Sequence, residues 1–319
     1  MQSKQYQNAI VYVDRYLPFN SDDDLAWYGR GIALGELGRY QEAIASYDKA
    51  LEIKPDYDSA WYNRGIALGE LGRYEKAIAS YDKAIEIKPD YDVWYNRGIA
   101  LGELGRYEKA IASYDKAIEI KPDNDSAWYN RGIALANLGR YEKAIASFDK
   151  AIEIKPDKDE AWNNRGIDLG NLGRYEKAIA SFDKALEIKP DKDEAWYNRG
   201  IALDELGRYE KAIASYDKAI EIKPDKDEAW YNRGIALDEL GRYEKAIASF
   251  DKAIEIKPDK DEAWYNRGYA LEKLGRYSEA IASYDKAKKY KSKLKNEKQG
   301  FFTNLLKFLP KFFDKITKN

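Results

Sequence analysis

The polar side chains that could do chemistry in this chain recur at a fixed spacing and do not gather in one place. A carboxamide carries both donors and an acceptor, so a regular column of asparagines can pair with the peptide groups of an extended chain without reading its side chains. Helix interiors disfavour asparagine unless something else requires it. The column consists of Asn63, Asn96, Asn130, Asn164, Asn198, Asn232 and Asn266. We predict that it binds peptide; the alternative is that duplicated asparagines hydrogen-bond locally, within or between the repeated segments.

Composition excludes most catalytic sites. The 319 residues contain no cysteine and no histidine, which removes disulfides, thiolate ligands, cysteine nucleophiles and the commonest metal ligand and general base. The acids, tyrosines and lysines recur as evenly spaced copies, whereas an active site needs one convergent constellation. We therefore predict that the protein is not an enzyme and holds no metal or cofactor.

Tryptophan sets the period of the chain. The steps between successive tryptophans are 34 residues, except for one step of 33 before Trp94, and the tryptophans are Trp27, Trp61, Trp94, Trp128, Trp162, Trp196, Trp230 and Trp264. Seven prolines, from Pro55 to Pro258, keep the same period. Such a period overrides the domain count that length alone would suggest, and it indicates an array of repeats.

Each repeat predicts two helices. In the copy that begins at Asp125, the apolar positions Ala127, Trp128, Gly132, Leu135 and Leu138 form one helical stripe. After Gly139 and Arg140 comes a second stripe, made of Tyr141, Ala144, Ile145, Phe148, Ala151 and Ile152, which ends before Pro156. The pattern predicts an antiparallel helical hairpin.

The later repeats show the spacing of a capping box. Asp157, Asp191 and Asp225 each stand three residues before a glutamate. This spacing predicts that the aspartates cap the amides at the start of the next helix.

The period and its residues together resemble the tetratricopeptide repeat. Glycine follows each Trp by four and by eleven residues, tyrosine comes two further on, and alanine, an aromatic residue, alanine and proline follow. Eight copies span residues 24–287. The resemblance implies an all-α, right-handed superhelical solenoid of antiparallel helical hairpins. It also implies that the first helices line a concave groove, which holds an extended peptide or a helix of a partner protein.

Side chains beside the asparagine column would give this groove its character. Tyrosine precedes most of the asparagines, and eight residues after the Trp the small residues of the first five repeats give way to acids. We predict that the peptide-binding residues, besides the asparagines, are Tyr62, Tyr95, Tyr129, Tyr197, Tyr231, Tyr265, Asp204 and Asp238. Such a surface favours a neutral or basic peptide and disfavours nucleic acid, whose phosphates need a basic surface. The alternative is an ordinary solvated acidic face.

One form of ligand known for the family is not expected. A clamp for a terminal carboxylate needs lysine on the groove face, and lysine is missing there until Lys273, although Arg64 and its equivalents recur. Repeat five differs most from the others, with Asn163 in place of tyrosine and Asp168 in place of alanine. We expect Asp168 to pair with an arginine such as Arg165 or Arg199, or to lie at a water-exposed edge, because an unpaired carboxylate between packed helices is costly.

The two ends depart from the repeat. Tyr6 and Ala9 lie one period before Tyr40 and Ala43, so residues 1–23 predict a capping helix, the second half of a missing first repeat, and a loop. Residues 288–319 form a basic amphipathic segment, and lysines outnumber acids eleven to two after Asp285. This tail predicts a cap on the last hairpin, a helix on an anionic membrane through residues 300–319, or a segment that enters a groove.

The N-terminal stretch lacks the features of a secretory signal, and no run reaches the length of a membrane span. We therefore predict a cytoplasmic scaffold that binds an extended peptide or helix of a partner protein in its concave groove. The alternative function is a membrane-peripheral adaptor tethered by the tail. Oligomeric state and the partner's identity do not follow from the sequence.

Overall fold

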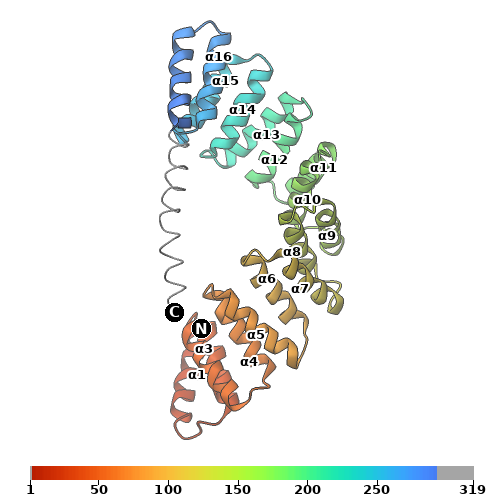
Figure 1. Ribbon diagram of the computed structural model, residues 1–319, viewed down its shortest axis with the longest axis vertical. Coiled ribbons are helices and arrows are strands. Elements are labelled where there is room, and N and C mark those ends of the chain that lie inside the picture. Colours follow the sequence, from red (N-terminus) through yellow and green to blue (C-terminus); the bar gives the residue numbers. More distant parts are fainter. Residues whose placement is uncertain (1, 293–319) are drawn as a thin grey trace, which may run out of the picture. The chain divides into compact units, whose positions relative to one another are not determined.

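The computed structural model describes residues 2–292, which are helical hairpins joined by short turns (Figure 1). They divide into two compact units, one up to Leu172 and one from Gly173 onward. The first unit holds α1 (Gln2–Tyr16), α2 (Asp24–Glu36), α3 (Tyr40–Ile53), α4 (Asp58–Glu70), α5 (Tyr74–Ile87), α6 (Tyr91–Glu103), α7 (Tyr107–Ile120), α8 (Asp125–Asn137), α9 (Tyr141–Ile154) and α10 (Asp159–Asn171).

The second unit continues the pattern. It holds α11 (Tyr175–Ile188), α12 (Asp193–Asp204), α13 (Tyr209–Ile222), α14 (Asp227–Glu239), α15 (Tyr243–Ile256) and α16 (Asp261–Lys273), and residues 277–292 are also helical. This last helix runs through position 288, where we placed the start of the tail; the remainder of that segment lies outside the described residues. The fold is the all-α array of hairpins that the sequence predicts.

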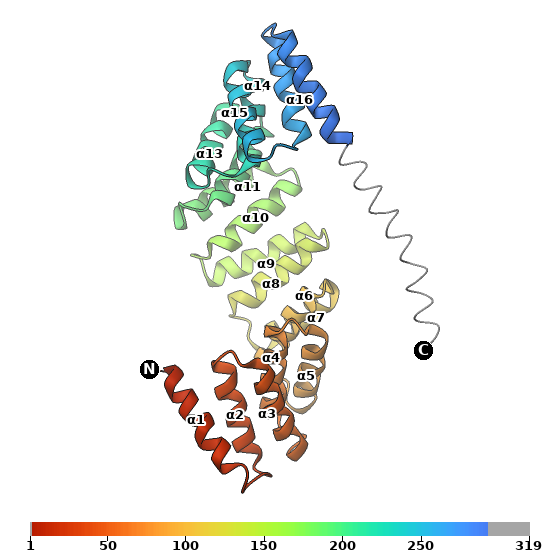
Figure 2. The same cartoon turned by 90° about the vertical axis from the view of Figure 1, so that its left-hand side faces the viewer.

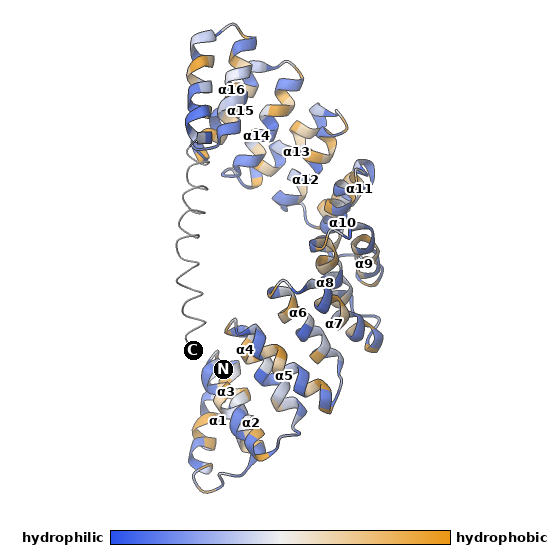
Figure 3. Ribbon diagram, viewed as in Figure 1, coloured by the Kyte–Doolittle hydropathy of each residue, from blue (hydrophilic) through white to orange (hydrophobic). Residues whose placement is uncertain are grey.

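Within each unit every helix packs on the next. In the first unit α2 packs on α3, α3 on α4, and so on to α10, and the even-numbered helices also contact one another. Figure 2 shows the successive hairpins from the side. Hydrophobic and hydrophilic residues alternate along the helices in Figure 3, as amphipathic packing requires. We call α2, α4, α6, α8, α10, α12, α14 and α16 the first helices, and the helices that follow them the second helices.

Glycine ends each first helix. In the second repeat Gly72 has φ +68°, a left-handed conformation that favours glycine. The Gly72 amide donates to the Gly69 carbonyl at 2.8 Å, and the Arg73 amide donates to the Leu68 carbonyl at 2.9 Å. This pair of bonds satisfies carbonyls that the end of a helix leaves open, as in a Schellman motif. The turn returns the chain as the antiparallel second helix.

A second glycine lets the two helices of a hairpin cross closely. A Cβ atom at Gly98 in α6 would lie 2.5 Å from Cε1 of Tyr114 in α7. Tyr114 is buried, as is Ala110, whose side chain is small enough for the crossing. The glycine and the alanine therefore set the distance between the two helices of this hairpin.

The tryptophans fill the junction between neighbouring repeats. Trp94 and Trp128 pack against a buried cluster that includes Ala117 and Ile118 at the end of α7. The Nε1 atom of Trp128 donates to the carbonyl of Pro122 at 2.9 Å. Trp128 thereby joins its own repeat to the loop that precedes it.

The N-terminal helix takes the place of a second helix. α1 packs on α2, and Ile10 is buried in the core of the first unit. Asp14 accepts a bond of 2.6 Å from Nε of Arg30, and Asp48, one period later, accepts the same bond from Arg64. α1 thus covers the first hairpin in the way that each second helix covers the next.

The predicted capping boxes are wrong. The N-cap residues of α10, α12 and α14 are Lys158, Lys192 and Lys226, and none of them makes a side-chain cap bond. The helices begin one residue later than the aspartates would require. Lys158 instead extends to the preceding repeat, where its Nζ donates to Asp125 at 2.6 Å. A contact between repeats has taken the place of a local cap.

Candidate functional site

Three pockets open at equivalent positions on the surface formed by consecutive first helices of the first unit, which we call the first-helix surface. Their volumes are about 200, 470 and 270 Å³. We name them the α4–α6, α6–α8 and α8–α10 pockets, after the first helices that flank them. The α4–α6 pocket is lined by Ile66, Gly69, Glu70, Tyr74, Tyr81, Asn96, Ile99, Ala100 and Glu103.

The other two pockets use the same positions one and two periods later. Gly69 corresponds to Gly102 and Ala136, and Asn96 corresponds to Asn130 and Asn164. The small residue at the first of these positions leaves the space open, since nothing lies within 4 Å of a Cβ atom built at Gly69 or Gly102. The sequence therefore produces one pocket in three copies, each with a predicted asparagine in its wall.

The asparagines also join one repeat to the next. Nδ2 of Asn130 on α8 donates to the hydroxyl of Tyr95 on α6 at 2.9 Å. The same bond, with lengths from 2.8 to 3.1 Å, links Asn63 to Tyr28, Asn96 to Tyr62, Asn164 to Tyr129, Asn232 to Tyr197, and Asn266 to Tyr231. The structure therefore joins six of the seven predicted asparagines to tyrosines. Asn198 is not among them, and the repeat before it has Asn163 in place of the tyrosine. An asparagine that donates here still has its carbonyl oxygen and a second N–H, although that of Asn96 donates to the carbonyl of Asp92 at 2.8 Å.

The tyrosines of this ladder are packed as well as hydrogen-bonded. The ring of Tyr129 lies tilted against Phe148, with centroids 5.8 Å apart, and Nζ of Lys158 lies 4.6 Å from its centroid on another side. Burial raises the pKa of these hydroxyls, that of Tyr62 to about 12, so they stay neutral and keep their hydrogen-bonding capacity. The corresponding tyrosine of the last repeat, Tyr265, is 57% exposed, and its ring lies tilted against Tyr284 with centroids 5.4 Å apart.

The recurrent arginines are directed at the second helices. Nε of Arg131 donates to Asp115 on α7 at 2.6 Å, and Nη1 donates to the buried Ser147 on α9 at 2.7 Å. Its guanidinium also lies 5.8 Å from the ring of Trp128. Arg64, Arg97, Arg199, Arg233 and Arg267 make the same pair of bonds. These arginines hold the repeats together.

Replacing Arg131 by methionine is expected to lower the stability of the first unit by about 1–2 kcal/mol, because two bonds from a charged group are lost. The loss stays moderate because Asp115 is partly exposed and Ser147 keeps its bond to the carbonyl of Lys143. Urea unfolding of the full chain measures the change. The control is Lys116→Met, which breaks only the exposed ion pair with Glu119 and should cost less than about 0.5 kcal/mol. Equal losses in both variants would contradict the assignment.

The predicted acids Asp204 and Asp238 lie at the ends of α12 and α14. One carboxylate oxygen of each is buried and has no hydrogen-bond partner among the described residues. Burial, together with the charge of Glu205, raises the pKa of Asp204 to about 6. Burial and the charge of Glu239 also raise the pKa of Asp238. Both carboxyl groups would be stabilised by a positive charge brought to them.

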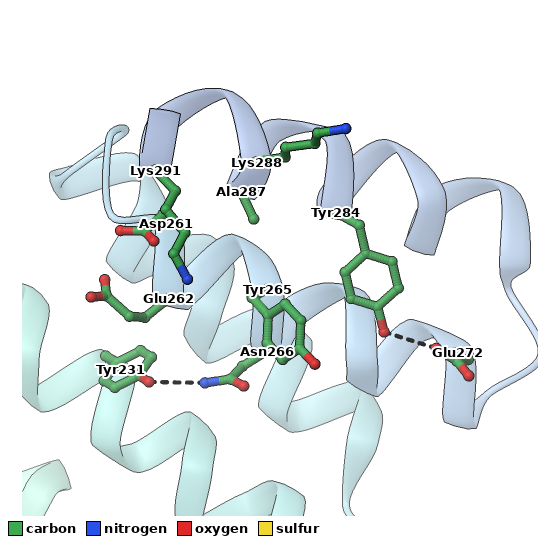
Figure 4. A pocket seen from close by; sticks show the side chains of 10 residues that line it. All are labelled: Tyr231, Asp261, Glu262, Tyr265, Asn266, Glu272, Tyr284, Ala287, Lys288 and Lys291. Atoms are coloured by element: carbon green, nitrogen blue, oxygen red, sulfur yellow. Dashed lines mark hydrogen bonds between the residues drawn. The ribbon is translucent and has the colours of Figure 1, made fainter. Parts of the chain in front are cut away.

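A further pocket of about 770 Å³ lies at the end of the second unit (Figure 4). Asn266 and Tyr231 form its inner wall and share the ladder bond of 2.9 Å. The hydroxyl of Tyr284 donates to Glu272 at 2.8 Å. Lys288 and Lys291 of the last helix form another wall, as Figure 4 shows. This pocket is lined by both acidic and basic side chains. The residues by which the sequence indicates it are those of the ladder, Asn266 and Tyr231.

The prediction for Asp168 is wrong in both of its forms. Arg165 donates to Asp149 and Arg199 donates to Asp183, each at 2.6 Å. Asp168 is 3% exposed, and its Oδ2 atom has no hydrogen-bond partner among the described residues. Burial raises the pKa of its carboxyl to about 7. Asn163, the other unusual residue of this repeat, is also buried and has an unpartnered Oδ1 atom.

Residues 2–292 contain no cluster of acidic side chains arranged to hold a metal ion. No helix among these residues is long and apolar enough to cross a membrane. The predicted membrane-binding segment, residues 300–319, lies outside the described residues.

Comparison with known proteins identifies the family. A family model of the tetratricopeptide repeat matches residues 3–58, 28–92, 95–159 and 163–227. Further models of the same repeat match residues 215–248, 237–275 and 261–293. The chain therefore belongs to the tetratricopeptide repeat family. Members of this family are scaffolds for protein interaction and are typically not enzymes. No curated protein matches the chain.

Solved structures share the fold. YrrB, a tetratricopeptide repeat protein described as having an unusual peptide-binding site, is 27% identical, with a TM-score of 0.53 over 57% of this chain and 95% of YrrB. MamA is also 27% identical, with a TM-score of 0.51 over 52% of this chain and 96% of MamA. A tetratricopeptide repeat protein from Parabacteroides merdae covers 78% of this chain and 98% of its own, at 21% identity and a TM-score of 0.57.

Proposed function

We propose that the first-helix surface binds an extended, neutral or basic segment of a partner protein. The observation that carries this proposal is the threefold repetition of one pocket at a constant register. Pockets at equivalent positions, one repeat apart, suit a chain that lies across several first helices and presents its side chains in turn. The peptide-binding site described for YrrB agrees with this kind of ligand.

The polar groups around the pockets support a peptide ligand. Asn130 and Asn164 each use one N–H for the tyrosine ladder and retain a second N–H and a carbonyl oxygen at the pocket wall. Asn96 donates to both Tyr62 and the carbonyl of Asp92, so it retains only its carbonyl oxygen. Glu70 and Glu103 line the first two pockets and give them negative charge. Complementary charge would favour a basic segment over an acidic one.

Filling the pockets provides the test. Gly69→Leu and Gly102→Leu place side chains where nothing lies within 4 Å, so the double variant should fold while losing pocket volume. Alanine at Asn130 would be a poorer choice, since it also breaks the bond to Tyr95. A partner is first captured from native extract, reduced to its shortest binding peptide and titrated calorimetrically. We expect at least tenfold weaker binding, about 1.4 kcal/mol.

The matched control is the pair Lys83→Leu and Lys116→Leu, which adds the same apolar side chains at exposed positions of α5 and α7. It should bind the peptide as the unchanged protein does. Equal affinity of the pocket-filled and unchanged proteins for the peptide, with the same melting temperature, would place the binding site elsewhere.

A further inference from the structure

The α8–α10 pocket differs from its two counterparts in the location of its acidic groups. In the α6–α8 pocket the exposed rim carries Glu103 and Asn137, and the floor is the buried Ala134. In the α8–α10 pocket the floor position is Asp168. Its rim positions are both asparagines, Asn137 and Asn171. The negative charge has moved from the rim to the floor.

Asp168 is the only carboxyl or basic side chain in the lining of this pocket, which consists of Ile133, Ala136, Asn137, Tyr141, Phe148, Asn164, Ile167, Asp168 and Asn171. The residue is 3% exposed, and its buried Oδ2 atom has no hydrogen-bond partner among the described residues. No neighbouring charge contributes to the shift of its pKa, which burial alone produces. A buried carboxylate without a partner is unfavourable, and a cation that enters the pocket would relieve that cost.

The amides around Asp168 favour a donor ligand. Nδ2 of Asn137 donates to the carbonyl of Ile133 at 3.0 Å, and Nδ2 of Asn164 donates to Tyr129 at 3.1 Å. Each of these two side chains can therefore offer a ligand its carbonyl oxygen and its remaining N–H. An ammonium or guanidinium group carries several donors and no acceptor, so it matches a carboxylate surrounded by amide oxygens.

We propose that the α8–α10 pocket takes the basic side chain of a bound peptide, with Asp168 as the group that selects it. The proposal rests on the function proposed above and names the specificity of one position within it. The pocket is about 270 Å³, far more than one water requires. Asp168 is thus a specificity-determining residue that the other repeats, with alanine at this position, do not have.

The test uses n-butylammonium, which is the side chain of lysine without its backbone, and n-propylguanidinium, which is that of arginine. The full chain is labelled with ¹³C at the aspartate carboxyl carbons, and the signal of Asp168 is the one missing from Asp168→Asn. The midpoint of its titration is then measured in either probe and in sodium chloride at equal ionic strength. We expect at least one probe to lower the midpoint by about 0.5 pH units or more, because a nearby cation favours the carboxylate.

Two variants make the result specific to the pocket. Ala136→Leu fills the pocket while keeping Asp168, and it should abolish the shift. Glu153→Gln removes an exposed charge of α9, which pairs with Lys150, and it should leave the shift unchanged. Equal midpoints in the probes and in sodium chloride would overturn the proposal, as would a shift that survives Ala136→Leu or one that 1-butanol reproduces.

The outcome of this experiment is distinguishable from the outcome of the test of the proposed function. If peptide binding is lost on filling the α4–α6 and α6–α8 pockets while neither probe moves the midpoint of Asp168, the surface binds peptide and the cation specificity is wrong. If a probe moves the midpoint while pocket filling has no effect on the peptide, the cation site exists and the peptide lies elsewhere.

Discussion

Replacing Gly98 by alanine is expected to destabilise the first unit by about 3 kcal/mol, whereas the same replacement at Gly102 is expected to stabilise it by about 0.5–1 kcal/mol. Both glycines lie in α6, four residues apart, so the two variants make the same chemical change in the same helix. They differ only in what the new methyl group meets. The pair therefore measures the close crossing of the hairpin with helix propensity held nearly constant.

The physical reason lies in the position of Tyr114. A Cβ atom at Gly98 would be 2.5 Å from Cε1 of this buried ring, 2.8 Å from Cδ1 and 2.9 Å from Cζ. Three ring atoms at such distances cannot be avoided by turning one flexible end, so α6 and α7 must separate or the ring must leave its place. Either movement disturbs packing at near-crystalline density. At Gly102 no atom lies within 4 Å, and alanine gains its ordinary advantage in a helix.

Urea unfolding followed by circular dichroism gives the two free energies. Hydrogen exchange of the α6 and α7 amides shows whether local stability changes in these two helices, since stability in a repeat array is a sum of local and nearest-neighbour contributions. We expect faster exchange in these helices for Gly98→Ala and slower exchange for Gly102→Ala. Similar behaviour of the two variants would show that the helices of the hairpin do not cross as closely as described.

Much of this architecture could be read from the sequence because it depends on short-range patterns. The helical stripes of residues 125–152, the glycine that ends each first helix and the proline that follows each second helix act within one repeat. Their spacing is therefore sufficient to predict the hairpin. The tetratricopeptide resemblance supplied the rest of the family assignment, which the comparisons confirm.

The contacts between repeats were harder to predict, since the partners lie about one period apart. The bond from Asn130 to Tyr95 joins residues 35 positions apart, and neither column alone reveals it. One signal was present in the sequence. The first repeat has Gly29 in place of asparagine, and it is preceded by α1, which takes the place of a second helix. An asparagine there would have no preceding tyrosine of this series to bind. That pattern indicates a bond between repeats.

Two errors show where such reasoning fails. The aspartates before α10, α12 and α14 have the spacing of caps, but lysines occupy the cap positions. Two of these lysines, Lys158 and Lys226, bind acids of the preceding repeat. For Asp168, the cost of an unpaired buried carboxylate argued for an arginine partner. Each nearby arginine bonds to its own aspartate instead. The residues around Asp168 do not by themselves reveal this competition between aspartates for the arginines.

Replacing Asp168 by alanine is expected to stabilise the protein at pH 8 by about 3 kcal/mol and to have little effect near pH 4. Alanine is the residue of the other repeats at this position, so the change restores their packing. The folded-state pKa of Asp168 is raised to about 7 from an ordinary value of 3.8, by burial. Below about pH 4 both the folded and the unfolded chain carry the proton, and the carboxyl then has no charge to desolvate.

Between about pH 4 and 7 the folded chain keeps a proton that the unfolded chain has lost, so this residue lowers stability progressively as pH rises. Above pH 7 the full cost of a buried, unpartnered carboxylate is present. The difference in unfolding free energy between Asp168→Ala and the unchanged protein should therefore grow through this window and then become constant. Measuring it as a difference cancels the titration of all other groups to the extent that they are independent.

Urea unfolding at a series of pH values measures this difference, and two variants make it interpretable. Asp168→Asn keeps a buried polar group but cannot ionise, so its stability relative to Asp168→Ala should not change through the window. Glu153→Ala removes an exposed acid of α9 and should stay within about 0.5 kcal/mol of the unchanged protein throughout. A pH-independent gain for Asp168→Ala would mean that ionisation of Asp168 carries no cost in the folded chain. A loss at pH 8 would mean that the carboxylate is stabilised by a partner. A gain that grows with pH and shrinks when n-butylammonium is added at pH 8 would show that a cation in the α8–α10 pocket offsets the cost, since ligand binding stabilises only the chain that retains Asp168.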